Sequence, residues 1–177
     1  QIPGTTWSKM AGSSRSFTAL KTDGTLWAWG SGVTGRTGQN NQTYYSSPVQ
    51  IPGTTWNHIS GSYGHFIATK TDGTLWVWGY NDNGQLGLNA AEVHRSSPCQ
   101  VPGTTWAFAS TALNVSLGVK TDGTLWAWGR NNYGDLAQNN VTRYSSPTQI
   151  PGTDWDTTGK WNQTYGGAQT VGVIKNL

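Results

Sequence analysis

The chain has 177 residues, of which only 11% are charged, and its formal net charge is +3. An ordinary soluble domain carries roughly 25% charged residues, and nucleic-acid binders usually gather their basic residues on one face or in one run. The 11 Lys and Arg residues are instead scattered singly, which argues against binding of DNA or RNA. No apolar run approaches the roughly 20 residues that span a bilayer. With Cys99 as the one cysteine, no disulfide can form within the chain.

A ten-residue segment, Lys-Thr-Asp-Gly-Thr-Leu-Trp-Xaa-Trp-Gly, occurs three times, at 21–30, 70–79 and 120–129. Successive copies begin 49 and 50 residues apart. A second segment, Gln-(Ile/Val)-Pro-Gly-Thr, recurs at nearly the same interval, beginning at Gln1, Gln50, Gln100 and Gln149. Self-similarity at such a period is typical of repeat proteins, in which each unit packs on the next one.

Within each ten-residue segment, Asp and Gly predict a two-residue hairpin turn because both residues tolerate positive φ. In the strand that follows, Leu and Ala or Val alternate with two Trp, so that both faces of the strand are apolar. A half-solvated sheet would show one polar face, so this sheet requires a neighbour on each side. The positions with this structural role are Asp23, Gly24, Trp27, Trp29, Asp72, Gly73, Trp76, Trp78, Asp122, Gly123, Trp126 and Trp128.

The second copy shows the whole unit. A first strand follows Trp56, and the hairpin strands are predicted at 66–70 and 74–78. A long polar loop begins at Tyr80 and leads to Ser-Ser-Pro-Xaa-Gln, an expected edge strand because Pro is tolerated at edges. No segment has sustained helical periodicity. About four short strands per roughly 50 residues predict an all-β, β-propeller-like array of four-stranded antiparallel blades.

The array is interpreted as a single repeat domain over residues 1–177. It comprises three full repeats, 7–55, 56–105 and 106–160, and a partial fourth at 161–177, in which Trp161 is matched with Trp56 and the residues just before it are interpreted as an insertion. The end units would expose apolar, Trp-bearing faces. We expect these faces to be covered by another copy in an oligomeric ring, by further sequence of a longer chain, or by a partner.

On these residues, the chain resembles the regulator-of-chromosome-condensation repeat family. Its bacterial and viral members carry very similar Lys-Thr-Asp-Gly-Thr-Leu-Trp-Ala-Trp-Gly segments and an Asn-rich loop like the one at 81–87. The resemblance covers essentially the whole chain and implies β-propeller blades, usually seven in a ring. The linking sequence, Ser-Ser-Pro-Xaa-Gln-Ile-Pro-Gly-Thr-Thr-Trp, is most similar to repeats in structural proteins of marine bacteriophages.

The chain departs from the family pattern at one position. Units of the family usually carry a His five residues before the Lys, and here His65 alone satisfies this. The equivalent positions hold Ser16, Val115 and Thr170. The place of His65 in the repeat favours a buried structural role over a functional imidazole. Signatures of the nuclear exchange-factor and light-sensing members are not found, so their activities are not expected.

The sequence shows no convincing catalytic or cofactor-binding pattern. His58, His65 and His94 share no spacing suited to a metal site. Residues 30–35 formally match a dinucleotide fingerprint, but no helix is predicted directly after them, as that motif requires. The repeated Asp residues belong to tight turns of separate units. We therefore expect no enzymatic activity, no cofactor and no metal.

Positions that vary between the copies, on exposed loops, are candidates for recognition. Before Ser-Ser-Pro and after Trp-Gly the copies carry aromatic and cationic side chains, which are enriched at binding hot spots. These candidates are Tyr44, Tyr45, Tyr80, His94, Arg95, Arg130, Arg143 and Tyr144. An ordinary solvated loop is the alternative interpretation.

We expect a non-enzymatic structural or binding protein that presents blade loops to a partner. The preferred setting is a bacteriophage virion, as a fibre, tail or capsid-decorating component at the virion surface or outside the cell. The partners would be further copies of the chain, other virion proteins or a host-surface receptor, without nucleic acid or membrane insertion. The alternatives are a secreted bacterial propeller that binds or inhibits another protein, a carbohydrate-binding propeller, and an enzyme that uses the central Trp and Asn residues.

Overall fold

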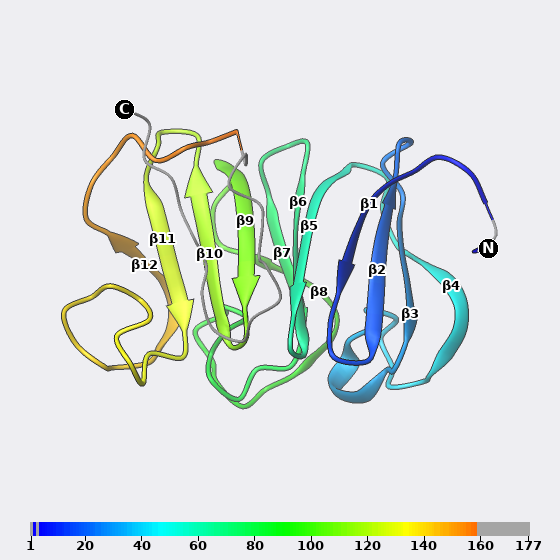
Figure 1. Ribbon diagram of the computed structural model, residues 1–177, viewed down its shortest axis with the longest axis horizontal. Helices are drawn as coiled ribbons and strands as arrows, with labels where there is room; N and C mark the ends of the chain where they lie inside the picture. The colour runs from blue at the N-terminus through cyan, green and yellow to red at the C-terminus, as the bar shows by residue number, and fades with distance from the viewer. Residues whose placement is uncertain (1, 3, 159–177) are drawn as a thin grey trace.

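The computed structural model describes residue 2 and residues 4–158. In this part of the chain, twelve strands form three separate four-stranded sheets, which lie side by side in the order of the sequence (Figure 1). Each sheet is an antiparallel meander whose strand order follows the chain. The protein is therefore the predicted all-β, β-propeller-like array of four-stranded antiparallel blades.

The first sheet consists of β1 (Trp7–Gly12), β2 (Ser16–Lys21), β3 (Leu26–Gly30) and β4 (Tyr45–Ile51). The second sheet consists of β5 (Trp56–Ser62), β6 (His65–Lys70), β7 (Leu75–Gly79) and β8 (Arg95–Val101). The third sheet consists of β9 (Trp106–Ala112), β10 (Val115–Lys120), β11 (Leu125–Gly129) and β12 (Tyr144–Ile150). The helical element in the described residues is the short 3₁₀ turn η1 (Val33–Gly35), and none of the helical structure there is long and apolar enough to cross a membrane.

The hairpin turn differs from the predicted two-residue form. The N–H of Gly24 donates to the carbonyl of Lys21 (3.1 Å), and the N–H of Lys21 donates to the carbonyl of Thr25 (3.0 Å). Three residues therefore close the hairpin, as a turn followed by a one-residue bulge. Positive φ is confined to the glycine, at +78°. Asp23 instead contributes its carboxylate, which accepts hydrogen bonds from the backbone N–H (2.9 Å) and the hydroxyl (2.7 Å) of Thr25.

Each of these turns also joins its unit to the next. The carbonyl of the turn glycine accepts the backbone N–H of the Trp that leads the following unit. The pairs are Gly24 with Trp56 (3.1 Å), Gly73 with Trp106 (2.9 Å) and Gly123 with Trp155 (3.1 Å). A Cβ on Gly73 would lie 2.2 Å from the carbonyl oxygen of Thr104. Glycine is thus required both for its positive φ and for the close approach of the next unit's backbone.

This bond gives Trp155 a contact that the leading Trp of the second and third units also make. The repeat spacing instead predicts that position for Trp161. The partial fourth repeat predicted at 161–177 lies outside the described residues.

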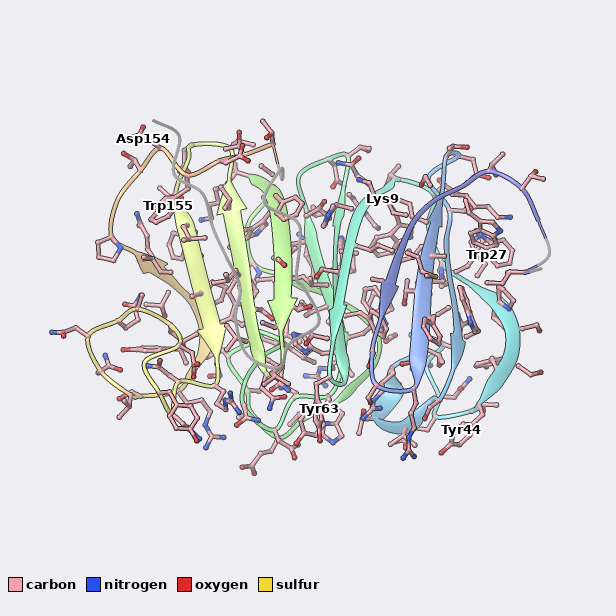
Figure 2. All side chains as sticks on the ribbon, in the orientation of Figure 1. Lys9, Trp27, Tyr44, Tyr63, Asp154 and Trp155 are labelled. Atoms are coloured by element: carbon pink, nitrogen blue, oxygen red, sulfur yellow. The ribbon has the colours of Figure 1, made fainter. Side chains whose placement is uncertain are left out.

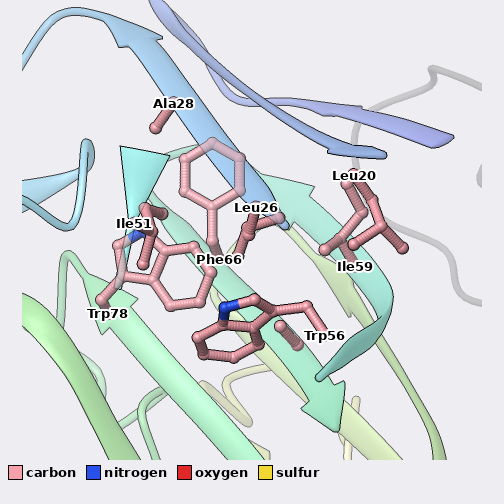
Figure 3. Close-up of a cluster of buried hydrophobic side chains, with 9 residues drawn as sticks. Leu20, Leu26, Ala28, Ile51, Trp56, Ile59, Phe66 and Trp78 are labelled. Atoms are coloured by element: carbon pink, nitrogen blue, oxygen red, sulfur yellow. The ribbon is translucent and has the colours of Figure 1, made fainter. Parts of the chain in front are cut away.

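Apolar clusters fill the spaces between neighbouring sheets. Between the first and second sheets, Leu26 and Ala28 of β3 and Ile51 of β4 pack with Phe66 and Trp78 (Figure 3). All five side chains are fully buried. A second cluster, which includes Val77 of the second sheet and Trp128 of the third, does the same at the next junction. The requirement for a neighbour on each face, inferred from the alternation of Leu, Ala and Trp, is confirmed for the second sheet.

The first sheet keeps one of its faces open. Phe17 of β2 stacks on Trp29 of β3, with ring centroids 5.8 Å apart, as Phe66 stacks on Trp78 at 5.7 Å in the second sheet. The second-sheet pair is buried, whereas Phe17 is 41% exposed and Met10, on β1, is 66% exposed. The same ring pair is therefore a core element in one unit and a surface element in another.

Candidate binding surface

The long loops of the three units gather at one end of the sheets, which we call the loop end. It is formed by the loops 31–44, 80–94 and 130–143 together with the turn between β5 and β6. The repeated Asp-Gly turns lie at the opposite end. Figure 2 shows Tyr44 and Tyr63 at the loop end, along the lower edge, Asp154 near the upper edge, and Trp27 in the upper half at the right. The variable loops and the strictly repeated turns therefore lie at opposite ends of the array.

One cluster of polar and aromatic side chains forms at the loop end around Tyr80. The hydroxyl of Tyr80 donates to the carboxylate of Asp82 (2.7 Å). Its ring packs against that of His94, with centroids 5.2 Å apart, and against the edge of Tyr63 at 6.0 Å. His94 accepts the N–H of Asn81 at Nδ1 (3.1 Å), so its Nε2 carries the proton and faces Asp82 at 3.6 Å.

The surroundings of Tyr80 favour its protonated, hydrogen-bond-donating form. Burial, together with its hydrogen bond to Asp82, raises the pKa of Tyr80 to about 12, so the hydroxyl is protonated at neutral pH. Arg143, from the third unit, donates through Nη1 to the backbone carbonyl of Asp82 (2.7 Å). The cluster therefore spans the junction of the second and third units.

Tyr63 was not among the residues singled out from the sequence. It lies in the turn between β5 and β6 and is 51% exposed. Its ring contact with Tyr80 joins the turn between β5 and β6 to the loop that follows β7 in the same unit. The position varies between copies, with Ser14 and Leu113 near the corresponding turns, and this variation is the sequence signal that would have pointed to it.

A second, smaller group lies in the third unit. Arg130 sits beside the ring of Tyr133, with its guanidinium carbon 5.8 Å from the ring centroid. The Nε of Arg130 is 4.0 Å from a carboxylate oxygen of Asp135. Tyr133 is 78% exposed, the largest exposure among the large apolar and aromatic side chains of the described residues.

The remaining candidates do not join either group. Tyr45 and Tyr144 are half-buried, and each hydroxyl accepts a hydrogen bond from an Asn side chain four residues earlier, Asn41 (3.0 Å) and Asn140 (3.1 Å). These bonds close equivalent loops in two units. Tyr44 is exposed and stands apart from the Tyr80 cluster, and the half-buried Arg95 begins β8. Of the sequence candidates, the structure brings together Tyr80, His94 and Arg143.

The polar groups of the repeated segment are occupied internally. The carboxylate of Asp72 accepts the N–H (3.0 Å) and the hydroxyl (2.6 Å) of Thr74, and the hydroxyl oxygen of Thr74 accepts the indole N–H of Trp76 (2.8 Å). The same chain of bonds recurs in the first and third units. The hydrogen bonds from Thr74 lower the pKa of Asp72 below its ordinary value. The carboxylate is therefore a poor candidate for proton transfer.

His65 is enclosed between the second and third sheets. Its Nε2 lies 3.0 Å from the hydroxyl of Ser116, which itself donates to the carbonyl of Gln85 (2.8 Å). Because that hydroxyl proton is already used, Nε2 is the donor to Ser116. Burial lowers the pKa of His65 to about 3, so the imidazole is neutral. Within residues 2 and 4–158, no group of three or more His, Cys, Asp or Glu side chains is placed to hold a metal ion.

Three four-stranded antiparallel units, each joined to the next through its turn glycine, define a β-propeller-type repeat protein. A family model for the regulator of chromosome condensation (RCC1) repeat matches residues 72–112 and 122–171, and a second RCC1 repeat model matches residues 56–85. These segments cover more than half of the sequence. The chain belongs to the RCC1 repeat family.

Solved propellers share the fold at low sequence identity. Human WBSCR16 superposes with a TM-score of 0.73 at 22% identity, over 82% of this chain and 38% of its own. Yeast Prp20p superposes with a TM-score of 0.74 at 17% identity, over 85% of this chain and 40% of its own. The chain thus spans about two fifths of the length of these structures. Comparison of the sequence with curated proteins finds no match.

Proposed function

We propose that the protein is a non-enzymatic binding and structural protein that presents its loop end to another protein. The supporting observation is a cluster in which the packed rings of Tyr63, Tyr80 and His94 lie beside Asp82, whose backbone carbonyl binds Arg143 of the next unit. Such side chains dominate binding hot spots. Loops held by a rigid scaffold are common sites of recognition. Prp20p, which shares the fold, has been studied for its binding to Gsp1p and histones, an analogy at the level of the fold.

We further propose that the setting is a bacteriophage virion, as a fibre, tail or capsid-decorating component at its surface. The support is the linking sequence Ser-Ser-Pro-Xaa-Gln-Ile-Pro-Gly-Thr-Thr-Trp, which resembles repeats in phage structural proteins. The partners would then be other virion proteins or a host-surface receptor. A secreted bacterial propeller that binds or inhibits another protein is the alternative, with a carbohydrate-binding propeller as a third candidate. Mass spectrometry of purified particles separates the virion setting from the other two.

The loop end is tested by substitution once cross-linking within purified particles has identified a partner. Tyr63→Ala and Arg143→Ala are each expected to weaken binding to that partner about tenfold or more, because hot-spot truncations cost about 2 kcal/mol or more and about 1.4 kcal/mol is tenfold. Titration calorimetry with the isolated partner measures the change. Tyr44→Ala is the matched control, since it removes an exposed tyrosine of the same end that lies outside the cluster. Unchanged affinity of both cluster variants would refute the assignment.

We also propose that the open face of the first sheet is covered by a second copy of the chain. Phe17, Trp29 and Met10 form an apolar surface whose counterpart in the second sheet is buried by a neighbouring sheet. Leu125 and Ala127, on the opposite side of the array, are already buried. The open face of one chain can therefore pack against the same face of a second chain about a twofold axis, which would cover the apolar surface of both.

Size-exclusion chromatography with light scattering tests this self-association. The chain is expected to elute at twice its 19.1 kDa mass. Phe17→Glu and Met10→Glu would each shift it to the mass of one chain, because a buried unpaired carboxylate is costly. Tyr133→Glu, at another exposed aromatic position, should leave the dimer intact. A stable, soluble monomer of the unaltered chain would contradict the proposal, as would a larger closed ring.

A further inference from the structure

Two pockets of the same construction lie where one unit meets the next. The first, of about 360 Å³, is lined by residues that include Gln39, Asn40, Trp56, Lys70, Trp76 and Pro98. The second, of about 440 Å³, is lined by residues that include Leu88, Asn89, Trp106, Lys120, Trp126 and Pro147. In each, one wall comes from the loop of the preceding unit and the others from two Trp, a Lys and the last strand of the following unit. We call them the Trp–Lys pockets.

The lysine of each pocket is held against two indole rings. The Nζ of Lys70 lies 4.6 Å from the ring centroid of Trp56 and 4.2 Å from that of Trp76. Those rings are 6.1 Å apart and cross at 75°. In the second pocket the Nζ of Lys120 lies 5.1 Å and 4.1 Å from the equivalent rings. Attraction between the cation and the ring faces orders an otherwise flexible side chain.

The ammonium group in each pocket lacks a direct acidic partner. Neither Lys70 nor Lys120 forms an ion pair with any residue that the structure describes. Asp72 is close enough for the charge of Lys70 to lower its pKa, after the larger effect of the Thr74 hydrogen bonds. Its carboxylate, however, is bound to the N–H and hydroxyl of Thr74 and does not reach the ammonium. The positive charge is thus available to a ligand.

The other pocket walls favour an apolar ligand that carries one anionic group. Most of the lining surface is apolar, and each pocket has two Trp and two Pro in its walls, as in grooves that take prolyl or other apolar residues. One amide side chain at each rim is held by a hydrogen bond within the protein. Gln39 donates to the carbonyl of Gln50 (3.0 Å), and Asn89 accepts the hydroxyl of Ser146 (3.2 Å). The walls are thus mainly apolar, with one ammonium group in each pocket.

We propose that the Trp–Lys pockets bind acidic peptide segments. A Glu or Asp carboxylate pairs with Lys70 or Lys120, and an adjacent prolyl or apolar residue packs on the Trp and Pro walls. This site is separate from the loop-end cluster and does not depend on it. Because the two pockets lie one repeat apart, a partner with two such segments would bind both and gain avidity.

The first unit supplies an internal control. Lys21 sits between Trp7 and Trp27, with its Nζ at 4.9 Å and 4.5 Å from their ring centroids, as in the other units. The wall that a preceding unit contributes to the Trp–Lys pockets has no counterpart here among the described residues. Substitution of Lys21 therefore removes the same cation–ring contact at a place where the described residues form no Trp–Lys pocket.

The test is a titration of the ¹⁵N-labelled chain, followed through the indole N–H signals of its 11 Trp residues. The probe is the peptide acetyl-Ala-Pro-Glu-Pro-Ala-amide, and its Gln analogue lacks the charge. We expect the signals of Trp76 and Trp126, assigned with single Trp→Phe variants, to shift. The Gln analogue should bind about tenfold more weakly, because a hydrogen bond to a charged group contributes about 1.5–3 kcal/mol.

The variants make the result specific. Lys70→Gln should abolish the shift of Trp76 and leave that of Trp126, Lys120→Gln should do the reverse, and Lys21→Gln should leave both. The unperturbed indole signals verify that each variant is folded. The proposal would be overturned if the Glu peptide caused no shift, or if the Glu and Gln peptides bound equally well. It would also be overturned if Lys21→Gln abolished the shifts of Trp76 and Trp126 as the other two variants do, or if trigalacturonate bound more tightly than the Glu peptide.

Discussion

Replacing Trp78 with alanine is expected to lower the free energy of unfolding by about 3–5 kcal/mol, the usual range for a large aromatic side chain removed from a core. Trp78 is fully buried, stacks on Phe66 at 5.7 Å, and meets Trp56 edge-on at 6.3 Å. Its indole N–H also donates to the carbonyl of Arg36 in the preceding unit (3.0 Å). The substitution would leave a cavity between two sheets and an unpaired carbonyl beside it.

Trp29→Ala is the matched control, because Trp29 occupies the same place in an almost identical sequence. It is only half-buried, and its partner Phe17 is 41% exposed, so its loss should cost about 1–2 kcal/mol of unfolding free energy. Urea unfolding of both variants, followed by circular dichroism, measures the difference. Equal losses for Trp78→Ala and Trp29→Ala would contradict the packing of the first sheet against the second.

Gly73→Ala should have the second large effect, a loss of about 3 kcal/mol. Placing alanine at the φ of +76° costs about 1–2 kcal/mol. The new Cβ would lie 2.2 Å from the carbonyl oxygen of Thr104, so the third unit must move away. That movement strains the hydrogen bond from Trp106 to Gly73, and losing such a bond costs about 1 kcal/mol more.

Gly123→Ala separates backbone strain from the clash between units. Its φ of +77° is the same, but its Cβ would meet its nearest neighbour, the backbone nitrogen of Asp154, at 3.1 Å. We therefore expect a loss close to the strain alone, about 1–2 kcal/mol of unfolding free energy. The comparison uses the urea midpoints of both variants. A Gly123→Ala variant as unstable as Gly73→Ala would show that positive φ, rather than the contact with the next unit, determines the cost.

The pair of glycines also shows why the ten-residue segment is so strictly repeated. It closes a hairpin, and its glycine carbonyl receives the leading Trp of the next unit. Its Asp and Thr side chains orient an indole ring in the same unit. Each of these groups has a partner in the fold, which supports a structural role for the segment and leaves the variable loops as the candidates for recognition.

Local chemistry was enough to predict the elements of each unit. The hairpin strands expected at 66–70 and 74–78 are β6 (His65–Lys70) and β7 (Leu75–Gly79). Alternating apolar side chains and an Asp-Gly turn specify such a hairpin through neighbours only a few residues apart. The turn type was predicted wrongly, because Asp-Gly fits both a two-residue loop and a three-residue loop with a bulge. The bonds of Lys21 decide between the two.

The period, the four-stranded unit and the apolar character of both sheet faces can all be predicted from the sequence, because they follow from short-range patterns. The stacking of the sheets makes Trp78 fully buried and leaves Trp29 half-buried, although their sequence surroundings are nearly identical. The tertiary structure also brings Tyr63 against Tyr80 and Arg143 to the backbone of Asp82, and it places Lys70 and Lys120 in pockets between units. The reason is physical. These relations depend on how one sheet stacks on the next, and a repeat pattern states which residues are equivalent but not which of them acquire a neighbour.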